Sequence, residues 1–234
     1  MGLIIADQRL DEKCEKALAD RGYEIVKLSG FGKLQEPISS HPDMLMFIGK
    51  GKLFCHREYY GKEKEKLDRI AEESGAELVL SDEKWEKDYP NDVLFNAVCL
   101  GDKLICCKKS VSKLILSCFD EENIVDTKQG YTKCSTVAVG DSAIITADPS
   151  IQKSCSTSGI DVLFLSGNFT SLDGYDTGFI GGASGTDGEN IYFCGDISKH
   201  PDGDRIIEFC KNHRKSVISL SEEPLYDYGS LFFV

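Results

Sequence analysis

The sequence predicts an α/β fold in which one strand–helix unit recurs five times, and an internal repeat is the first observation that supports it. Ile4-Ile5-Ala6-Asp7 recurs as Ile145-Thr146-Ala147-Asp148, and apolar residues follow both runs at the spacing of a helix face. The offset between the two runs is 141 residues, which equals three periods of 47. A regular period of this length is typical of a fold assembled from equivalent supersecondary units.

Turn signals are the second observation. The segment from Val98 to Ile105 contains Gly101-Asp102, and it recurs 39 residues later with Gly140-Asp141 at the same place. Glycine beside aspartate between two apolar runs predicts a β-hairpin. Further segments run from a glycine through apolar residues to a serine, at residues 22–29, 75–81 and 159–166, with residues 217–221 as a version lacking the glycine. These glycines lie where a helix is expected to end in a left-handed residue.

Each unit therefore contains a helix, a buried strand, a loop and a β-hairpin. Helices are expected near residues 11–20, 62–74, 111–119, 150–157 and 203–212. The segments before the hairpins contain Asp43, Asp92, Cys134, Asp176 and Asp227, spaced 49, 42, 42 and 51 residues apart. Five such units occupy the whole chain as a single domain, residues 1–234.

The two ends of the chain complement each other. The last unit stops at a single apolar strand, residues 230–234, and residues 2–6 supply the strand that it lacks. Pairing of these strands removes free sheet edges and places the loops before the hairpins around one axis. We therefore expect a five-bladed α/β propeller with pseudo-five-fold repeats, closed by its N- and C-terminal strands.

Composition excludes several classes of function. The net charge of −12 is spread along the chain, so no basic face for nucleic acid is expected. No apolar stretch approaches the length of a membrane span, and residues 1–8 form a short apolar run without a basic leader. We therefore expect a cytoplasmic protein without membrane contact. The ten cysteines lie singly in apolar runs or as the adjacent Cys106-Cys107 pair, which predicts reduced thiols and neither a metal site nor a cofactor.

Three short motifs carry a family resemblance. They are Asp92-Val93-Leu94-Phe95, Tyr131-Thr132-Lys133 and Val217-Ile218-Ser219-Leu220-Ser221-Glu222. Together with the five-fold unit, they resemble the pentein superfamily of guanidine-modifying enzymes, which includes amidinotransferases and dimethylarginine dimethylaminohydrolases. The resemblance spans nearly the whole chain and implies a ring with a central substrate pore.

The resemblance also implies a catalytic set that this sequence carries only in part. In the family a cysteine attacks the guanidinium carbon, a histidine transfers protons and carboxylates hold the cation. Asp92 matches one family acid, although Pro90 and Asn91 replace the two glycines before it. The family histidine falls on Tyr131, and its nucleophile falls on Tyr228-Gly229-Ser230. Other family acids fall near Ile48-Gly49, so ordinary guanidine chemistry is not expected.

A relocated thiol is the open alternative. Cys134 lies beside Lys133 near the expected pore, and a neighbouring cation would lower the pKa of its thiol. His41, which precedes Pro42-Asp43 before a hairpin, or Asp92 would assist it. Equally, Cys134 opens an apolar run and could be a packed strand residue. His200 precedes Pro201-Asp202-Gly203 and is interpreted as a loop or capping residue.

The leading hypothesis is a ring that binds a small cationic or zwitterionic, arginine-like metabolite without turning it over. The glycine-rich segment 175–185 could bring backbone N–H groups close to a ligand. The expected ligand-binding residues are Asp43, Asn91, Tyr131, Lys133, Asp176, Gly181, Gly182, Asp227 and Ser230. The alternatives are a thiol-dependent hydrolase or amidinotransferase that uses Cys134, and a protein-interaction ring. The oligomeric state is not indicated by the sequence.

Overall fold

Five similar units make up the computed structural model, which describes residues 2–234. In each unit an antiparallel pair of strands is followed by a helix and by a third strand parallel to the second. Unit one consists of β15 (Leu231–Phe233), β1 (Leu3–Asp7), α1 (Glu12–Ala19) and β2 (Glu24–Leu28). Unit two consists of β3 (Met46–Gly49), β4 (Lys52–His56), α3 (Arg57–Ser74) and β5 (Glu77–Ser81).

The other three units have the same order of elements. Unit three consists of β6 (Val98–Leu100), β7 (Lys103–Cys106), α4 (Lys113–Leu116) and β8 (Ile124–Asp126). Unit four consists of β9 (Thr136–Val139), β10 (Ala143–Thr146), α5 (Pro149–Thr157) and β11 (Asp161–Phe164). Unit five consists of β12 (Ser184–Thr186), β13 (Asn190–Phe193), α6 (Gly203–Asn212) and β14 (Ser216–Ser219). The short α2 (Pro42–Leu45) and three 3₁₀ turns, Glu36–Ile38, Glu121–Asn123 and Ile197–Lys199, lie in the connections.

The repeat found in the sequence corresponds to equivalent strands. The two runs at an offset of 141 residues lie on β1 and β10, each of which is the middle strand of its unit. Both strands lead into a helix that begins at an aspartate, because the Asp11 carboxylate accepts from Lys13 N and that of Asp148 accepts from Ser150 N. The predicted glycine ends are also confirmed, since Gly75 closes α3 with a φ of +64°.

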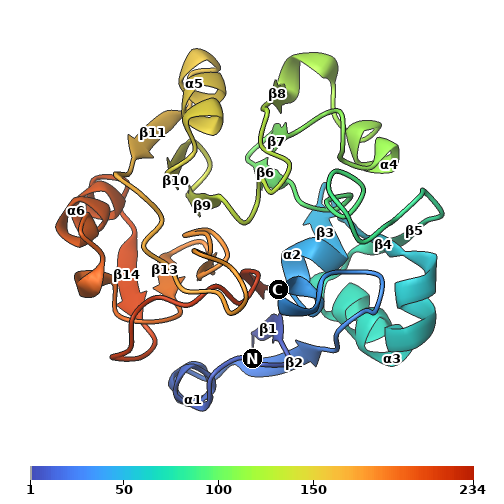
Figure 1. Ribbon diagram of the computed structural model, residues 1–234, viewed down its shortest axis with the longest axis horizontal. Coiled ribbons are helices and arrows are strands. Elements are labelled where there is room, and N and C mark those ends of the chain that lie inside the picture. Colours follow the sequence, from blue (N-terminus) through green and yellow to red (C-terminus); the bar gives the residue numbers. More distant parts are fainter. Residues whose placement is uncertain (1) are drawn as a thin grey trace.

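The predicted pairing of the chain termini is confirmed. β1 pairs antiparallel with β15, with Ile4 opposite Phe233 and Ile5 opposite Phe232. β15 also pairs parallel with β12, so units one and five share a six-stranded sheet in the order β14-β13-β12-β15-β1-β2. The remaining units each form a three-stranded sheet. Figure 1 shows the five units arranged around the middle of the molecule, with both termini close together.

Two predicted helices have different bounds. α3 begins at Arg57, earlier than expected, because the imidazole of His56 accepts from Glu58 N and caps the first turn. α4 ends at Leu116, earlier than expected. After it, Cys118 N and Phe119 N bond to the third residue before them, as in tight turns, and the chain leaves the α-helical path.

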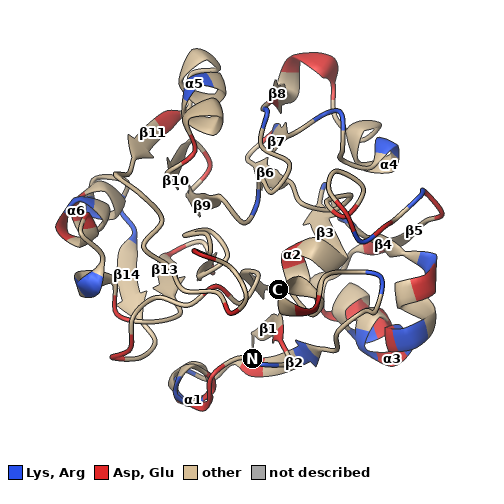
Figure 2. Cartoon of the chain, in the orientation of Figure 1, with Lys and Arg blue, Asp and Glu red and all other residues tan. Residues whose placement is uncertain are grey.

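Charged residues lie mostly on the outer helices and loops, where both signs are interspersed (Figure 2). On α3, Lys64 pairs with Asp68, as expected for a solvated helix face, whereas Lys66 pairs with Glu63, whose carboxylate is buried. Exposed pairs of this kind contribute at most about 1 kcal/mol each. No helix within residues 2–234 is long and apolar enough to cross a membrane.

We expect deletion of residues 230–234 to cause aggregation or loss of cooperative unfolding. The deletion removes the partner of one edge of β1, and it takes Ser230 from a buried hydrogen-bond network. Size-exclusion chromatography and a thermal melt measure the effect. A truncated protein that stays monodisperse with an unchanged midpoint would contradict it.

Candidate functional site

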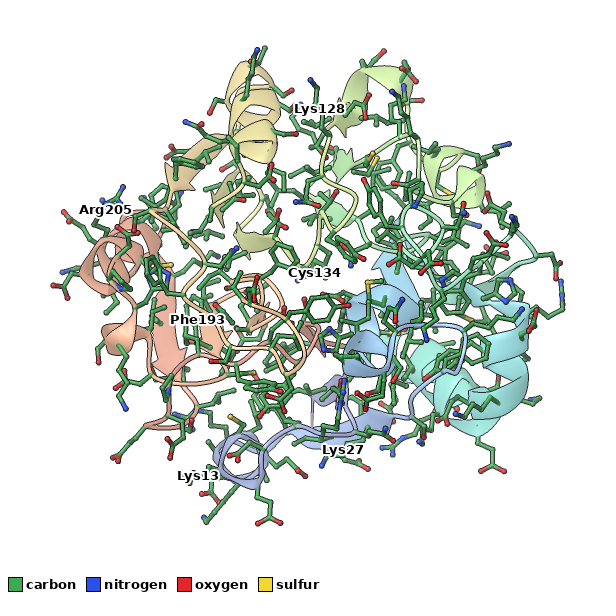
Figure 3. All side chains as sticks on the ribbon, in the orientation of Figure 1. Lys13, Lys27, Lys128, Cys134, Phe193 and Arg205 are labelled. Atoms are coloured by element: carbon green, nitrogen blue, oxygen red, sulfur yellow. The ribbon has the colours of Figure 1, made fainter. Side chains whose placement is uncertain are left out.

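The segments that precede the first strands of the units converge on a buried polar cluster. We call it the central cluster and define it as His41, Asp43, Lys133, Cys134, Asp227 and Ser230. His41 and Asp43 come from the start of α2, before β3; Lys133 and Cys134 precede β9; Asp227 and Ser230 precede β15. In Figure 3 Cys134 lies near the middle of the molecule, whereas Lys13 and Arg205 lie at its periphery.

A chain of hydrogen bonds runs through this cluster. The Lys133 ammonium donates to Ser230 Oγ over 2.8 Å, and the Ser230 hydroxyl donates to Asp43 Oδ2 over 2.8 Å. Ser230 Oγ also lies 3.1 Å from the carbonyl oxygen of Gly181. Burial lowers the pKa of Lys133, and the nearby carboxylates of Asp43 and Asp227 oppose that change.

His41 lies between two buried carboxylates. Its Nδ1 is 3.7 Å from Asp227 Oδ1, and its Nε2 is 3.8 Å from Asp7 Oδ2. Within the described residues, Nδ1 has no hydrogen-bond partner. Asp227 accepts backbone hydrogen bonds from Phe179 and Gly229, and burial raises its pKa while His41 opposes the rise. Asp7 is a site-lining residue that sequence reasoning missed, although a carboxylate at the end of an apolar strand was visible there.

The glycine-rich segment packs against protein atoms, which corrects the expectation that it approaches a ligand. A Cβ at Gly182 would lie 1.9 Å from Asp227 Oδ1, and one at Gly181 would lie 2.5 Å from the Cys134 carbonyl oxygen. Gly182 N donates to that same carbonyl, so its N–H is already paired. These glycines therefore allow the chain to pack closely around Asp227 and Cys134.

Asn96 holds the Cys134 side chain in position by a hydrogen bond, and Asn96 was not among the residues predicted from the sequence. Its Nδ2 donates to Cys134 Sγ over 3.0 Å and to the Asp43 carbonyl over 3.1 Å, while its Oδ1 accepts from Lys133 N over 2.7 Å. The only sequence signal was a single amide between Phe95 and Ala97 in an apolar run. A buried amide needs partners, and here they come from the central cluster.

The Cys134 thiol differs from the activated nucleophile of the sequence hypothesis. The residue is 3% exposed. Burial raises the pKa of the thiol well above its usual range, and the carboxylates of Asp43 and Asp227 raise it further. The pKa of the Cys134 thiol is therefore raised, not lowered as the sequence hypothesis expected from the neighbouring lysine.

Asp92 lies apart from the hydrogen-bond chain of the central cluster. It is 1% exposed, and its Oδ2 accepts from the Tyr131 hydroxyl over 2.6 Å. Its Oδ1 is buried without a hydrogen-bond partner among residues 2–234. Burial raises the pKa of Asp92, and the hydrogen bond from Tyr131 opposes that rise.

Aromatic rings stack beside this carboxylate. The ring of Tyr131 lies between those of Tyr89 and Phe179, with centroids 5.8 and 6.0 Å away. Glycine at position 130 leaves room for the Tyr89 ring, because a Cβ there would lie 2.4 Å from that ring. The pKa of Tyr175 is raised by burial and by the Asp92 charge. We call Asp92 together with the rings of Tyr89, Tyr131 and Phe179 the Asp92 site.

Three further residues singled out from the sequence lie elsewhere. Asn91 turns away from the Asp92 site, because its amide donates to Glu86. Asp176 is exposed on a loop and does not join the central cluster. His200 is a local capping residue as interpreted, since its Nδ1 accepts from Asp202 N. The described residues contain no group of three or more histidine, cysteine or carboxylate side chains that could hold a metal ion.

A family model matches residues 5–232, almost the whole chain. The chain belongs to DUF6873, a family of unknown function. No curated protein matches the chain.

Solved structures show the fold. A cysteine-to-serine mutant of dimethylarginine dimethylaminohydrolase from Pseudomonas aeruginosa, complexed with citrulline, is similar at a TM-score of 0.54 and 10% identity, over 94% of this chain and 92% of that one. The arginine dihydrolase ArgZ of the cyanobacterial ornithine–ammonia cycle is similar at a TM-score of 0.52 and 10% identity, over 95% of this chain and 38% of that one. The fold is therefore that of the pentein superfamily, as the sequence resemblance indicated.

We expect Cys134 to resist alkylation in the native protein. It is buried and its pKa is raised, so its thiolate population is small. Cys99 and Cys118 are half-buried; burial also raises the pKa of Cys99, so access of the reagent is what favours these two thiols. Peptide mapping after limited iodoacetamide treatment should find label on Cys99 and Cys118 first. Preferential label on Cys134, suppressed by a guanidino compound, would restore the relocated-thiol hypothesis.

Proposed function

We propose that the five units close into a five-bladed propeller, and that it binds a small cationic, arginine-like ligand at the Asp92 site without turning it over. Two observations support the closed ring: each unit has the same strand order, and the chain termini pair. The observation that carries the ligand proposal is the Asp92 carboxylate, which is buried without a cation.

A buried carboxylate normally has a charged or hydrogen-bonded partner for each oxygen, because desolvation of the charge is costly. Asp92 receives one hydrogen bond from a side chain, from Tyr131, and no lysine, arginine or histidine of residues 2–234 forms an ion pair with it. A guanidinium or ammonium group would supply the missing partner for Oδ1.

The surrounding rings favour a cation of this kind. Aromatic faces attract guanidinium and ammonium groups, and the attraction grows when water is excluded. Tyr89, which stacks on Tyr131, is 51% exposed and lies outside the strands. Movement of the Tyr89 side chain would give a ligand access to the site without disturbing the strands. Guanidino compounds are also the substrates that the names of the structural neighbours indicate.

The residues present favour binding over turnover. Tyr131 stands where the resemblance places the family histidine, and its pKa is raised by burial and by its bond to Asp92. Ser230 lies in the segment where the resemblance places the family nucleophile. Its hydroxyl donates to the Asp43 carboxylate, which is the base in contact with it among the described residues. The hydrolase or amidinotransferase that uses Cys134 with His41 or Asp92 has no such support, and the protein-interaction ring stays a prediction.

We expect guanidino compounds to raise the thermal midpoint through Asp92. A screen of arginine, methylated arginines, agmatine and citrulline should reveal a stabilising ligand, since occupancy at 100 times the Kd contributes about 2.7 kcal/mol. Asp92→Asn keeps the shape and removes the charge, and it should weaken that ligand at least about tenfold, or about 1.4 kcal/mol.

Asp176→Asn is the matched control, because it removes an exposed carboxylate from the neighbouring loop region. It should bind like the parent protein. Equal affinity in the parent and Asp92→Asn proteins, or no response to any cationic compound, would refute the proposed ligand site.

We also expect no ordinary amidinohydrolase activity. Release of citrulline or ornithine from arginine, methylarginine and agmatine should stay far below a typical enzyme rate, because the family nucleophile and base are replaced here. Turnover on the order of 1 per second would count against this expectation.

A further inference from the structure

A cavity lies among the first strands of the units. Its volume is about 260 Å³, and all five first strands line it, with Phe47 on β3, Cys99 on β6, Ala138 on β9, Thr186 on β12 and Phe232 on β15. Residues of the Asp92 site do not line it. The cavity is therefore a separate space, and an inference about it does not depend on the proposed cation site.

Its lining is apolar with one charge. Lys133 is the only charged residue that borders the cavity, and the other polar side chains there are Ser184, Thr186 and the Cys99 thiol. Lys133 Nζ lies 5.6 Å from the centroid of the Phe232 ring, which places the ammonium next to the cavity wall. An ammonium at the end of an apolar space is complementary to an anion with an apolar body.

The ammonium has unused hydrogen-bonding capacity. Of its three donors, one is used by Ser230 Oγ, and no carboxylate of residues 2–234 forms a direct ion pair with it. Asp43 is reached only through the Ser230 hydroxyl, which donates to Asp43 and accepts from Lys133. Burial lowers the pKa of Lys133, whereas Asp43 and Asp227 favour the charged lysine, and their charges would weaken the attraction for an anion. Nevertheless, no acidic side chain of residues 2–234 pairs directly with the Lys133 ammonium.

We propose that this cavity binds a small monocarboxylate with an apolar body, of the size of benzoate, whose carboxylate pairs with the Lys133 ammonium. The apolar body contacts the strand side chains, and its removal from water favours binding. The ion pair distinguishes an acid from a neutral compound of the same shape.

Benzoate, benzyl alcohol and benzylamine, titrated by calorimetry into the full-length protein, test the charge preference. Benzoate should bind at least tenfold more tightly than benzyl alcohol, and benzylamine more weakly than either. Equal binding of the three compounds, or tighter binding of benzylamine, would overturn the proposal, as would no binding of benzoate at millimolar concentration.

Cys99 reports where benzoate binds. Cys99 borders the cavity and Cys118 does not, and both thiols are half-buried. Benzoate should slow iodoacetamide labelling of Cys99 and leave labelling of Cys118 unchanged. Benzoate binding without protection of Cys99, or with equal protection of both thiols, would place it outside the cavity and overturn the proposal.

Variants complete the test. Lys133→Met should reduce benzoate affinity to that of benzyl alcohol. Because this change also disturbs the central cluster, Cys99→Phe provides a second variant: the larger side chain fills the space and should abolish binding, while Cys118→Phe, matched in chemistry but outside the cavity, should retain it. Unchanged affinity in Cys99→Phe would overturn the proposal. Arginine-type ligands should still bind both cysteine variants, so failure here and failure at the Asp92 site are distinguishable.

Discussion

The hydrogen-bond chain from Lys133 through Ser230 to Asp43 is the interaction on which the centre of the molecule depends. It joins the segments before β9, β15 and β3, which come from three different units. Asn96 adds the segment before β6, and Gly181 adds the one before β12. All five connecting segments thus meet through buried polar contacts, and an apolar replacement at one position would leave the others without partners.

This network also explains the shape of the site. Glycine is required at positions 181 and 182 because protein atoms occupy the space where a side chain would stand. Gly229 is required for the same reason, since a Cβ there would lie 2.1 Å from that of His41. The centre is consequently filled by its own side chains. A cavity remains among the first strands of the units.

Much of the fold could be predicted from the sequence because its elements depend on short-range sequence patterns. The repeated apolar runs, the hairpin turns at Gly101 and Gly140, and the glycine that ends α3 all depend on residues near one another in the chain. The pairing of the termini was predictable because each end lacked a partner strand. The early start of α3 was missed because a histidine cap is an uncommon signal.

The site was less predictable because its properties depend on distant residues. Spacing placed Asp43, Cys134 and Asp227 before first strands, but only the structure shows that two carboxylates and burial raise the pKa of the Cys134 thiol. The partner of Cys134, Asn96, lies 38 residues away and belongs to no motif. The rings of Tyr89 and Phe179 likewise meet Tyr131 only after the units have assembled.

The pairing of β1 with β15 has a consequence for biosynthesis. Ile4 is synthesised long before its partner Phe233. Until β15 has been made, one edge of β1 has no native neighbour, although β2 can already cover the other. Contacts of such large sequence separation form late and slowly. During this interval the apolar edge of β1 must be kept from pairing with other chains, which makes aggregation during synthesis a hazard of this architecture.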